Sequence, residues 1–287
     1  CLQERDNMRM NLPPAPSVLL PNGVSMPRLG LGTWPMNDIE AMIAVEAALN
    51  MGYRLIDTAE SYQNERGVGE GLRRSGLCRE EVFITSKFSR QWHSMEGVRT
   101  ACENSLKRLG VDYLDLFLVH WPNPDQNRYV EAFAGLERLL EAGLVRAIGT
   151  SNFKPAHLQR LFDQGLVPHV NQIQLDPYHL RDDEVTIHRA RGILTATWGP
   201  LGRGRGNLLD DPVITAIAWR HGVTPVQVVL RWHTQQDFIP IPTSLHPKRM
   251  AENLDSFHFT LSADDMKALG GLDRPDPDML DADSFGH

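Results

Sequence analysis

Four residues with complementary proton chemistry stand at or just after the ends of short apolar segments. Asp57, Lys87 and His120 each close such a segment, and Tyr62 follows the first of them. A tyrosine is a poor acid at neutral pH because its unperturbed pKa is about 10. A lysine ammonium beside the phenol lowers that pKa, and a neutral histidine can donate a hydrogen bond to a carbonyl oxygen. These residue types predict a site that protonates an oxygen while another group attacks the carbonyl carbon.

Strand alternation is what would bring these side chains together. Successive side chains point to opposite faces of a strand, so Asp57, Lys87 and His120 each share a face with apolar residues earlier in their segments. If those faces point into a barrel, the three side chains meet at its mouth, where burying a charge is costly unless it is paired. We therefore expect an Asp57–Lys87 ion pair. Taken singly, a structural ion pair, a core histidine and a packing tyrosine are the simpler interpretations; their combination favours catalysis.

The elements that must position these residues repeat along the chain. Apolar segments occur at Leu29–Gly32, Arg54–Asp57, Val82–Lys87, Tyr113–His120, Val145–Ser151, Val170–Leu175, Leu194–Trp198 and Phe238–Pro242. Helical patterns occur at Asp38–Asn50, Glu65–Arg74, Ser94–Leu109, Tyr129–Glu141, Pro155–Phe162, Asp182–Arg191, Pro212–His221, Thr224–Thr234 and Pro247–Asp255. This alternation predicts an α/β fold, a closed (β/α)8 TIM barrel. An Asn-Gly turn between Ser17–Leu20 and Val24–Met26 adds an N-terminal β-hairpin.

The rival architecture is an open, doubly wound sheet. It would need a glycine-rich fingerprint directly after its first strand. The segment Leu29–Trp34 lacks the third glycine of that fingerprint, and Pro35 follows it. The alternating glycines of Gly202–Gly206 are interpreted as a flexible loop rather than as a phosphate cradle. The barrel is therefore the predicted fold.

The domain organisation follows from the length of 287 residues, which suits one barrel. We assign residues 17–287 to a single barrel domain with a C-terminal tail. The tail, Asp273–His287, is rich in aspartate and proline and is expected to be mobile. Residues 1–16 are expected to be disordered or left over from cloning. Because a barrel closes without a partner, we expect a monomer.

The composition argues against several kinds of partner. A formal net charge of −7 argues against nucleic-acid binding, and no apolar run reaches membrane-spanning length. The three cysteines, Cys1, Cys78 and Cys102, form neither a disulfide framework nor a metal-binding pattern. This favours a reducing compartment and a cytoplasmic location.

Several segments resemble the aldo-keto reductase family, in particular microbial members similar to 2,5-diketo-D-gluconate reductase. They are Gly52–Ala59 with the following Tyr62, Ile84–Lys87, and Asp112–Pro122, and the resemblance extends over nearly the whole chain. It implies reduction of aldehydes or ketones by hydride transfer from a nicotinamide cofactor. By the same resemblance, Tyr62 donates the proton, Lys87 and Asp57 adjust its acidity, and His120 orients the carbonyl.

The resemblance also implies the residues that bind NADPH. They are Ser151, Asn152, Gln172, Trp198, Leu201, Thr243, Ser244, Arg249, Glu252 and Asn253. Thr243 stands where the family often has a lysine that binds the 2′-phosphate, so NADH is a possible second cofactor. The loop after Trp198 is short, which predicts fast cofactor exchange.

Three tryptophans in loops, Trp34, Trp92 and Trp121, are predicted to wall the pocket for a small carbonyl substrate. Two other functions stay open. One is a nicotinamide-binding redox sensor on the same barrel, without turnover. The other is a metal-dependent hydrolase that uses Asp57 and His120, although no further ligand stands at a suitable strand end; we expect no metal.

Overall fold

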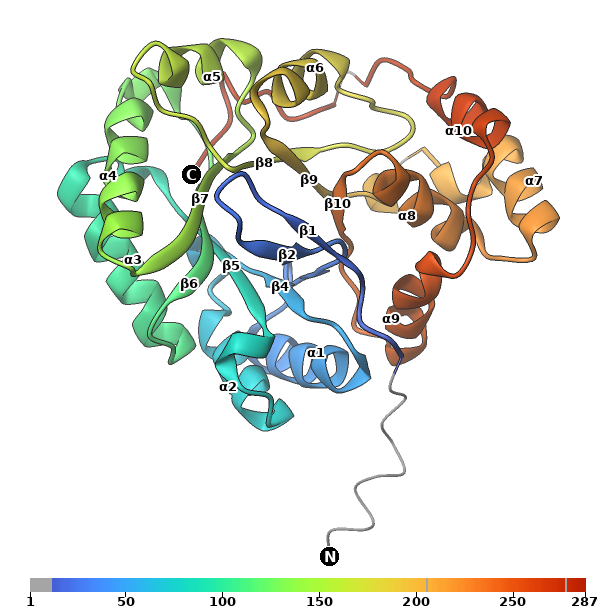
Figure 1. Cartoon of the computed structure of the whole chain (residues 1–287), viewed down its shortest axis with the longest axis horizontal. Coiled ribbons are helices and arrows are strands. Elements are labelled where there is room, and N and C mark those ends of the chain that lie inside the picture. The colour runs from blue at the N-terminus through green and yellow to red at the C-terminus, as the bar shows by residue number, and fades with distance from the viewer. Residues whose placement is uncertain (1–11, 205, 277) are drawn as a thin grey trace, which may run out of the picture.

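The computed structural model describes residues 12–204, 206–276 and 278–287. Eight parallel strands form one sheet in the order β10-β9-β8-β7-β6-β5-β4-β3. The amides of Gly30 and Gly32 donate to the carbonyl oxygens of Pro240 and Pro242, at 3.1 and 3.0 Å, and so join the first strand to the last. Figure 1 shows the resulting ring of strands with helices around it. The (β/α)8 barrel prediction is confirmed.

The elements begin and end within two residues of the predicted positions. The barrel strands are β3 (Leu31–Gly32), β4 (Leu55–Asp57), β5 (Phe83–Phe88), β6 (Leu114–Val119), β7 (Val145–Ser151), β8 (Val170–Gln174), β9 (Leu194–Trp198) and β10 (Ile239–Ile241). The helices are α1 (Asp38–Met51), α2 (Glu65–Ser75), α3 (Met95–Leu109), α4 (Tyr129–Glu141), α5 (Pro155–Phe162), α6 (Asp182–Arg191), α7 (Pro212–His221), α8 (Pro225–Gln235), α9 (Pro247–Leu254) and α10 (Ala263–Gly270).

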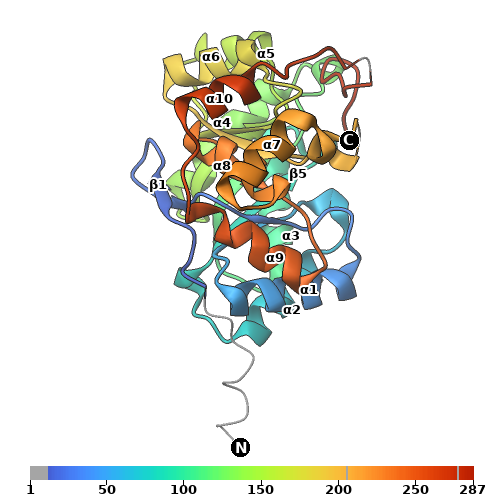
Figure 2. The same ribbon diagram turned by 90° about the vertical axis from the view of Figure 1, so that its right-hand side faces the viewer.

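Helix α10 was not predicted, although the sequence contains a signal for its start. The Ser262 side chain accepts from the Asp265 amide at 3.1 Å, and the Asp265 carboxylate accepts from the Ser262 amide at 3.0 Å. This reciprocal pair is a capping box, which satisfies two amides at a helix start. Figure 2 shows α10 with α7, α8 and α9 on one side of the barrel.

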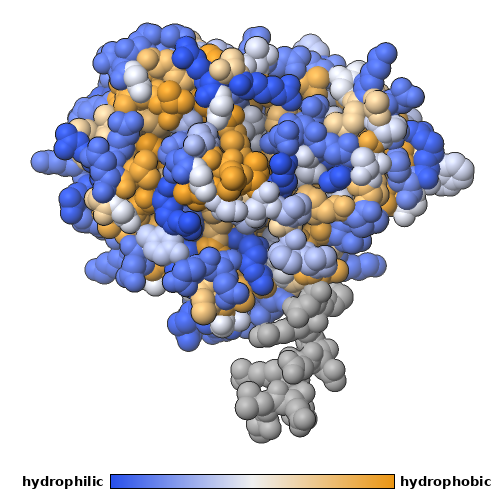
Figure 3. Space-filling model, viewed as in Figure 1, coloured by the Kyte–Doolittle hydropathy of each residue, from blue (hydrophilic) through white to orange (hydrophobic). Residues whose placement is uncertain are grey.

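The predicted hairpin closes one end of the barrel. Strands β1 (Ser17–Leu19) and β2 (Ser25–Pro27) pair in antiparallel register. Leu20 and Met26 are buried against side chains from the barrel interior, such as Leu55. Figure 3 shows apolar surface over the hairpin, where Leu19 is 66% exposed. The hairpin therefore covers the end of the barrel where the strands begin, opposite the end where they finish.

Alternation within the strands separates two packing layers. Leu55, Phe83 and Leu116 face the interior, whereas Ile56, Ile84 and Phe117 pack in the layer between strands and helices. Burying each such side chain contributes about 1.5–3 kcal/mol. Moving one strand by a single residue would exchange these layers, so packing fixes which polar residues point inward at the strand ends.

Residues 1–11 of the segment that we expected to be disordered lie outside the described residues. Residues 12–16 lie against the barrel: the Leu12 amide donates to Met51 at 3.2 Å, and the Pro16 carbonyl accepts from Arg28 at 2.8 Å. In the described part of the chain, no single helix has the length and apolarity of a membrane span; α7 and α8 have them only as a pair bent by 91°.

Candidate active site

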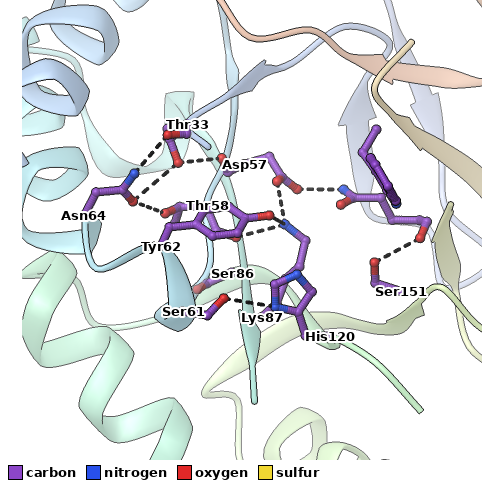
Figure 4. A network of polar contacts seen from close by, with 12 residues as sticks. Thr33, Asp57, Thr58, Ser61, Tyr62, Asn64, Ser86, Lys87, His120 and Ser151 are labelled. Atoms are coloured by element: carbon purple, nitrogen blue, oxygen red, sulfur yellow. Dashed lines mark hydrogen bonds and ion pairs between the residues drawn. The ribbon is translucent and has the colours of Figure 1, made fainter. Parts of the chain in front are cut away.

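Lys87 is the centre of the polar network at the barrel mouth (Figure 4). Its ammonium donates to the Asp57 carboxylate at 2.5 Å, to the Thr58 carbonyl at 3.0 Å and to the Tyr62 hydroxyl at 3.4 Å. An ammonium has three protons, so all of them have an acceptor. The Lys87 side chain is fully buried and Asp57 nearly so. The predicted ion pair is present, and it lies directly against the tyrosine.

The strands and one short helix explain this convergence. Asp57 is the last residue of β4, Lys87 lies near the end of β5, and His120 directly follows β6. Tyr62 ends the 3-10 helix η2 (Glu60–Tyr62), in the loop after β4. Parallel neighbours end at the same edge of the barrel, which is why three consecutive strands bring their side chains together.

The loop that carries Tyr62 is held by Asn64, which our sequence analysis missed. The Asn64 amide nitrogen donates to the carbonyl oxygens of Thr33 and Met36, both at 2.9 Å, and its oxygen accepts from Thr58 at 2.8 Å. Asn64 is fully buried. A buried amide with three partners is costly to disturb, so this residue fixes the position of Tyr62 relative to the strands.

The second oxygen of Asp57 is also occupied. It accepts from the Gln172 side-chain amide at 2.7 Å, while the first oxygen accepts from Lys87. Gln172 therefore joins the acid of β4 to strand β8 across the barrel. Both oxygens of the carboxylate are thus held, one by a cation from β5 and one by an amide from β8.

The charges of the network follow from burial and from Lys87. Burial raises the pKa of Tyr62, and the Lys87 ammonium only partly opposes this. Burial lowers the pKa of Lys87, but Asp57 and Tyr62 outweigh it, so that pKa is raised. Burial and then Lys87 hold the pKa of His120 well below its usual range. At neutral pH the site thus holds a protonated phenol, an ammonium and a neutral imidazole.

This result agrees with our expectation for His120 and differs from it for Tyr62. The sequence led us to expect a lowered pKa for the phenol. In the structure Tyr62 is half-buried at the wall of the barrel mouth, and the loss of solvation that a phenolate would suffer there exceeds the attraction of one ammonium. The phenol is therefore held in its acid form.

Polar side chains at the ends of β7, β8 and β9 contact one another next to this network. The Asn152 amide nitrogen donates to the His120 carbonyl and to the Ser151 hydroxyl, both at 3.1 Å, and its oxygen accepts from the Trp198 indole at 2.8 Å. The Ser151 hydroxyl donates to the Gln172 carbonyl at 2.9 Å. An indole surface with amides and a hydroxyl beside it suits a flat ring that carries a carboxamide.

The Asn171 side chain does not belong to this set, although Asn171 directly precedes Gln172 in β8. It points to the helix layer, where its oxygen accepts from Thr150 and its nitrogen lies 2.8 Å from His188. The difference follows from strand alternation, which turns Asn171 and Gln172 to opposite faces of β8.

The other residues predicted to bind NADPH lie between the end of β10 and the end of α9, except Leu201, which follows β9. Thr243 forms a parallel bridge with Gly32, the Ser244 hydroxyl accepts from the His246 amide at 3.1 Å, and Arg249 is exposed. Glu252 is half-buried and Asn253 is buried in the same helix, and Leu201 is half-buried in the loop after β9. A hydroxyl and an exposed cation at a helix N-terminus suit a phosphate.

A cavity of about 790 Å³ opens beside Tyr62. Trp34 lines it, but the other two predicted wall residues do not. The Trp92 indole donates to the Glu60 carboxylate at 2.8 Å, and Trp121 is buried under Phe285, with ring centroids 4.7 Å apart.

The C-terminal tail contributes to the site instead of lying apart from it. Phe285 covers Trp121, and His287 lines the cavity. Lys154 forms ion pairs with Asp281 and, at 2.7 Å, with Asp283. The described part of the tail is thus held against the barrel by several contacts, where the sequence had suggested mobility.

Comparisons with known proteins agree with this geometry. The model of the Aldo/keto reductase family matches residues 28–274. Morphine 6-dehydrogenase from Pseudomonas putida is 43% identical over 94% of this chain and 97% of its own. An aldo/keto reductase structure from Brucella melitensis superposes with a TM-score of 0.87 at 42% identity, over 90% of this chain and 100% of that one.

A further solved structure, a variant of Gox0644 in complex with NADPH, superposes with a TM-score of 0.90 at 42% identity, over 94% of this chain and 98% of that one. The sequence match spans the barrel strands that carry Asp57, Lys87 and His120. We conclude that this chain is an oxidoreductase that belongs to the aldo/keto reductase family.

Proposed function

We propose that this protein reduces aldehydes or ketones to alcohols with NADPH, and that Tyr62 is the general acid. The observation that carries the proposal is the Lys87 ammonium, which donates to Asp57 and Tyr62 at once. Relatives of similar fold have been solved with NADPH or NADP, including the Gox0644 variant and a Bombyx mori enzyme.

The residues of the barrel mouth fit the cofactor in two groups. Trp198 with Asn152, Ser151 and Gln172 would hold the nicotinamide end, because an indole and amide groups match a flat ring with a carboxamide. Thr243, Ser244, Leu201, Arg249, Glu252 and Asn253 would hold the rest. When bound, NADPH supplies the hydride that adds to the carbonyl carbon.

The protein residues supply the proton and the orientation. Tyr62 gives its proton to the carbonyl oxygen as negative charge develops there, and a positioned acid of this kind contributes about 10²–10⁴ in rate. Lys87 stabilises the phenolate that is left, and Asp57 holds Lys87 in place. His120 is neutral and donates a hydrogen bond to the same oxygen.

The substrate proposal is a small carbonyl compound. A cavity of about 790 Å³ beside Tyr62 can enclose one, and Trp34 offers an apolar wall. The Glu60 carboxylate, which also lines the cavity, accepts from the Trp92 indole and the Ser89 amide, which are neutral donors.

The test is Tyr62→Phe, with consumption of NADPH measured against phenylglyoxal, methylglyoxal and simple ketones. We expect kcat to fall by about 10²–10⁴ while NADPH still quenches tryptophan fluorescence as in the wild type. Tyr113→Phe, which removes a hydroxyl far from the cavity, is the matched control and should retain full activity. An unchanged kcat in Tyr62→Phe would remove Tyr62 from the acid role. A wild type that binds neither NADPH nor NADH would contradict the function itself.

A further inference from the structure

A chain of polar contacts runs from the C-terminal tail to the imidazole of His120. The His287 ring nitrogen Nε2 lies 2.9 Å from the Ser61 hydroxyl oxygen. The same oxygen lies 3.4 Å from Nδ1 of His120, at the long end of hydrogen-bond distance. The His287 and His120 rings also meet edge to face, with centroids 4.6 Å apart. Figure 4 shows Ser61 directed at His120 from the loop after β4.

This chain bears on which nitrogen of His120 carries the proton. A neutral imidazole has one N–H and one acceptor nitrogen, and the hydrogen bond at one nitrogen decides the state of the other. Ser61 is the hydrogen-bond partner of Nδ1, while Nε2 has no partner among the described residues. Nε2 is therefore the atom left for a carbonyl oxygen, and it can donate only if Nδ1 accepts.

Ser61 makes Nδ1 an acceptor when its hydroxyl proton points at Nδ1. A donor to the Ser61 oxygen from the other side favours this orientation. His287 can supply that donor: if its Nε2 carries a proton, it donates to the Ser61 oxygen, and the Ser61 hydroxyl proton is then directed at Nδ1 of His120. The opposite direction, from His120 through Ser61 to His287, would leave Nε2 of His120 without a proton. Such a histidine could not donate to a carbonyl.

We propose that His287 and Ser61 are positioning residues that hold His120 in the tautomer protonated at Nε2. The role of His120 toward the carbonyl rests on the proposed function; the tautomer itself does not. Neither residue touches the reacting atoms in this scheme, and both act through His120.

The tail is held firmly enough to serve this purpose. The carbonyl oxygen of His287 accepts from the Arg90 amide at 3.0 Å. Phe285 packs on Trp121, and the Asp283 carboxylate lies 2.9 Å from His157 and 2.7 Å from Lys154. Backbone, aromatic and charged contacts thus place the His287 ring next to Ser61.

The experiment is heteronuclear NMR of protein with isotope-labelled histidine, which distinguishes the two tautomers by the shifts of the ring nitrogens. The His120 signal is assigned by its loss in His120→Phe. In the wild type without cofactor we expect His120 to be protonated at Nε2. In Ser61→Ala and in His287→Phe the signal should move toward a mixture of both tautomers.

Conservative variants separate this role from a structural one. Ser61→Thr keeps the hydroxyl and His287→Gln keeps an N–H donor, so both variants should show the wild-type His120 signal. For Ser61→Ala we expect kcat to fall about fivefold, as for the loss of one hydrogen bond, with unchanged affinity for NADPH. Ser284→Ala, which removes a hydroxyl from the tail away from His120, should change neither quantity.

A wild-type His120 protonated at Nδ1, or a Ser61→Ala spectrum identical to the wild type, would overturn the proposal even in an active enzyme. Conversely, a protein with the expected tautomer and no carbonyl reduction would contradict the proposed function and leave the tautomer assignment standing.

Discussion

The two halves of the barrel mouth hold their polar residues in different ways. In the catalytic half, formed by the ends of β4, β5 and β6 with η2, the buried Lys87 and Asp57 form an ion pair and Tyr62 completes the set. In the cofactor half, formed by the ends of β7 to β10 with α9, the Trp198 indole donates a hydrogen bond to the Asn152 side chain. Arg249 stands exposed at the rim.

The difference matches what each half has to do. Stabilising charge in a transition state requires groups that are already in place, because reorganising them would consume the gain. The groups of the catalytic half use their hydrogen bonds on one another and are fixed by strands. Both protons of the Asn152 amide are already donated, so a carboxamide oxygen would take one of them only in exchange for the His120 carbonyl or the Ser151 hydroxyl. The groups of the first half are fixed by one another, whereas such an exchange is what a carboxamide oxygen would require in the second.

The largest effect is expected from Lys87→Met, which tests the ion pair of the catalytic half. It leaves the Asp57 carboxylate buried with Gln172 but without its cation. Removing one partner of a buried pair costs about 3–5 kcal/mol of the free energy of unfolding. Urea denaturation followed by tryptophan fluorescence measures this, and activity should be lost as well.

The double variant Asp57→Asn with Lys87→Met is the control for Lys87→Met. It removes both charges, so most of the stability should return while activity stays absent. If the free energy of unfolding of Lys87→Met lies within about 1 kcal/mol of the wild-type value, the two charges do not depend on each other for stability.

The next effect is expected from His188→Phe, in the helix layer behind the cofactor half. His188 is fully buried, with Nε2 2.8 Å from Asn171 and Nδ1 2.9 Å from the Thr195 hydroxyl. The substitution leaves both partners short of a hydrogen bond in a buried place. We expect a loss of about 2–4 kcal/mol in the free energy of unfolding. A loss below 1 kcal/mol, measured by urea denaturation, would mean that water replaces the ring.

Much of the catalytic half could be predicted from the sequence, for a physical reason. Alternation along a strand and the common direction of parallel strands decide where Asp57, Lys87 and His120 point once the fold is known. The place of Tyr62 could be predicted as well, because only four residues separate it from Asp57 at the end of β4. The strand and helix boundaries also lay close to the observed ones, since apolar periodicity and glycine stops are local signals.

What could not be predicted depends on how loops and the tail pack. The raised pKa of Tyr62 results from its burial, which no local pattern encodes. Asn64 holds the loop only because distant carbonyl groups surround it. His287 reaches Ser61 from the far end of the chain. These contacts join segments far apart in sequence, so one sequence without its fold does not reveal them.

A smaller effect is expected from Arg249→Ala, which tests the exposed rim of the cofactor half. If Arg249 binds the 2′-phosphate, its loss removes a charge-assisted hydrogen bond, worth about 1.5 kcal/mol at an exposed site. The Kd for NADPH should rise about tenfold, and the Kd for NADH should not change. Fluorescence titration of both cofactors measures this. Lys248→Ala, at the neighbouring exposed cation, is the matched control. An equal rise in Kd for this variant would mean that the loss of positive charge, and not a specific contact of Arg249, weakens NADPH binding.

The smallest effect at neutral pH is expected from His93→Phe, the counterpart of His188→Phe in the catalytic half. His93 is buried beside Phe88, and neither of its ring nitrogens has a hydrogen-bond partner in the structure. Replacing it therefore leaves no group unpaired, and the free energy of unfolding should change by less than about 1 kcal/mol. The difference between the stability losses of His188→Phe and His93→Phe then reports the two hydrogen bonds of His188.

Acid conditions should turn this small effect into a gain in stability relative to the wild type. Burial lowers the pKa of His93 from 6.5 to about 4, so between these values the unfolded chain binds a proton that the folded chain does not. Stability then falls as the pH falls through this window, by up to roughly 3 kcal/mol for this residue. His93→Phe removes that loss, so urea midpoints measured from neutral pH down to pH 4 should fall less steeply than in the wild type. Parallel slopes would show that His93 keeps its proton in the folded protein.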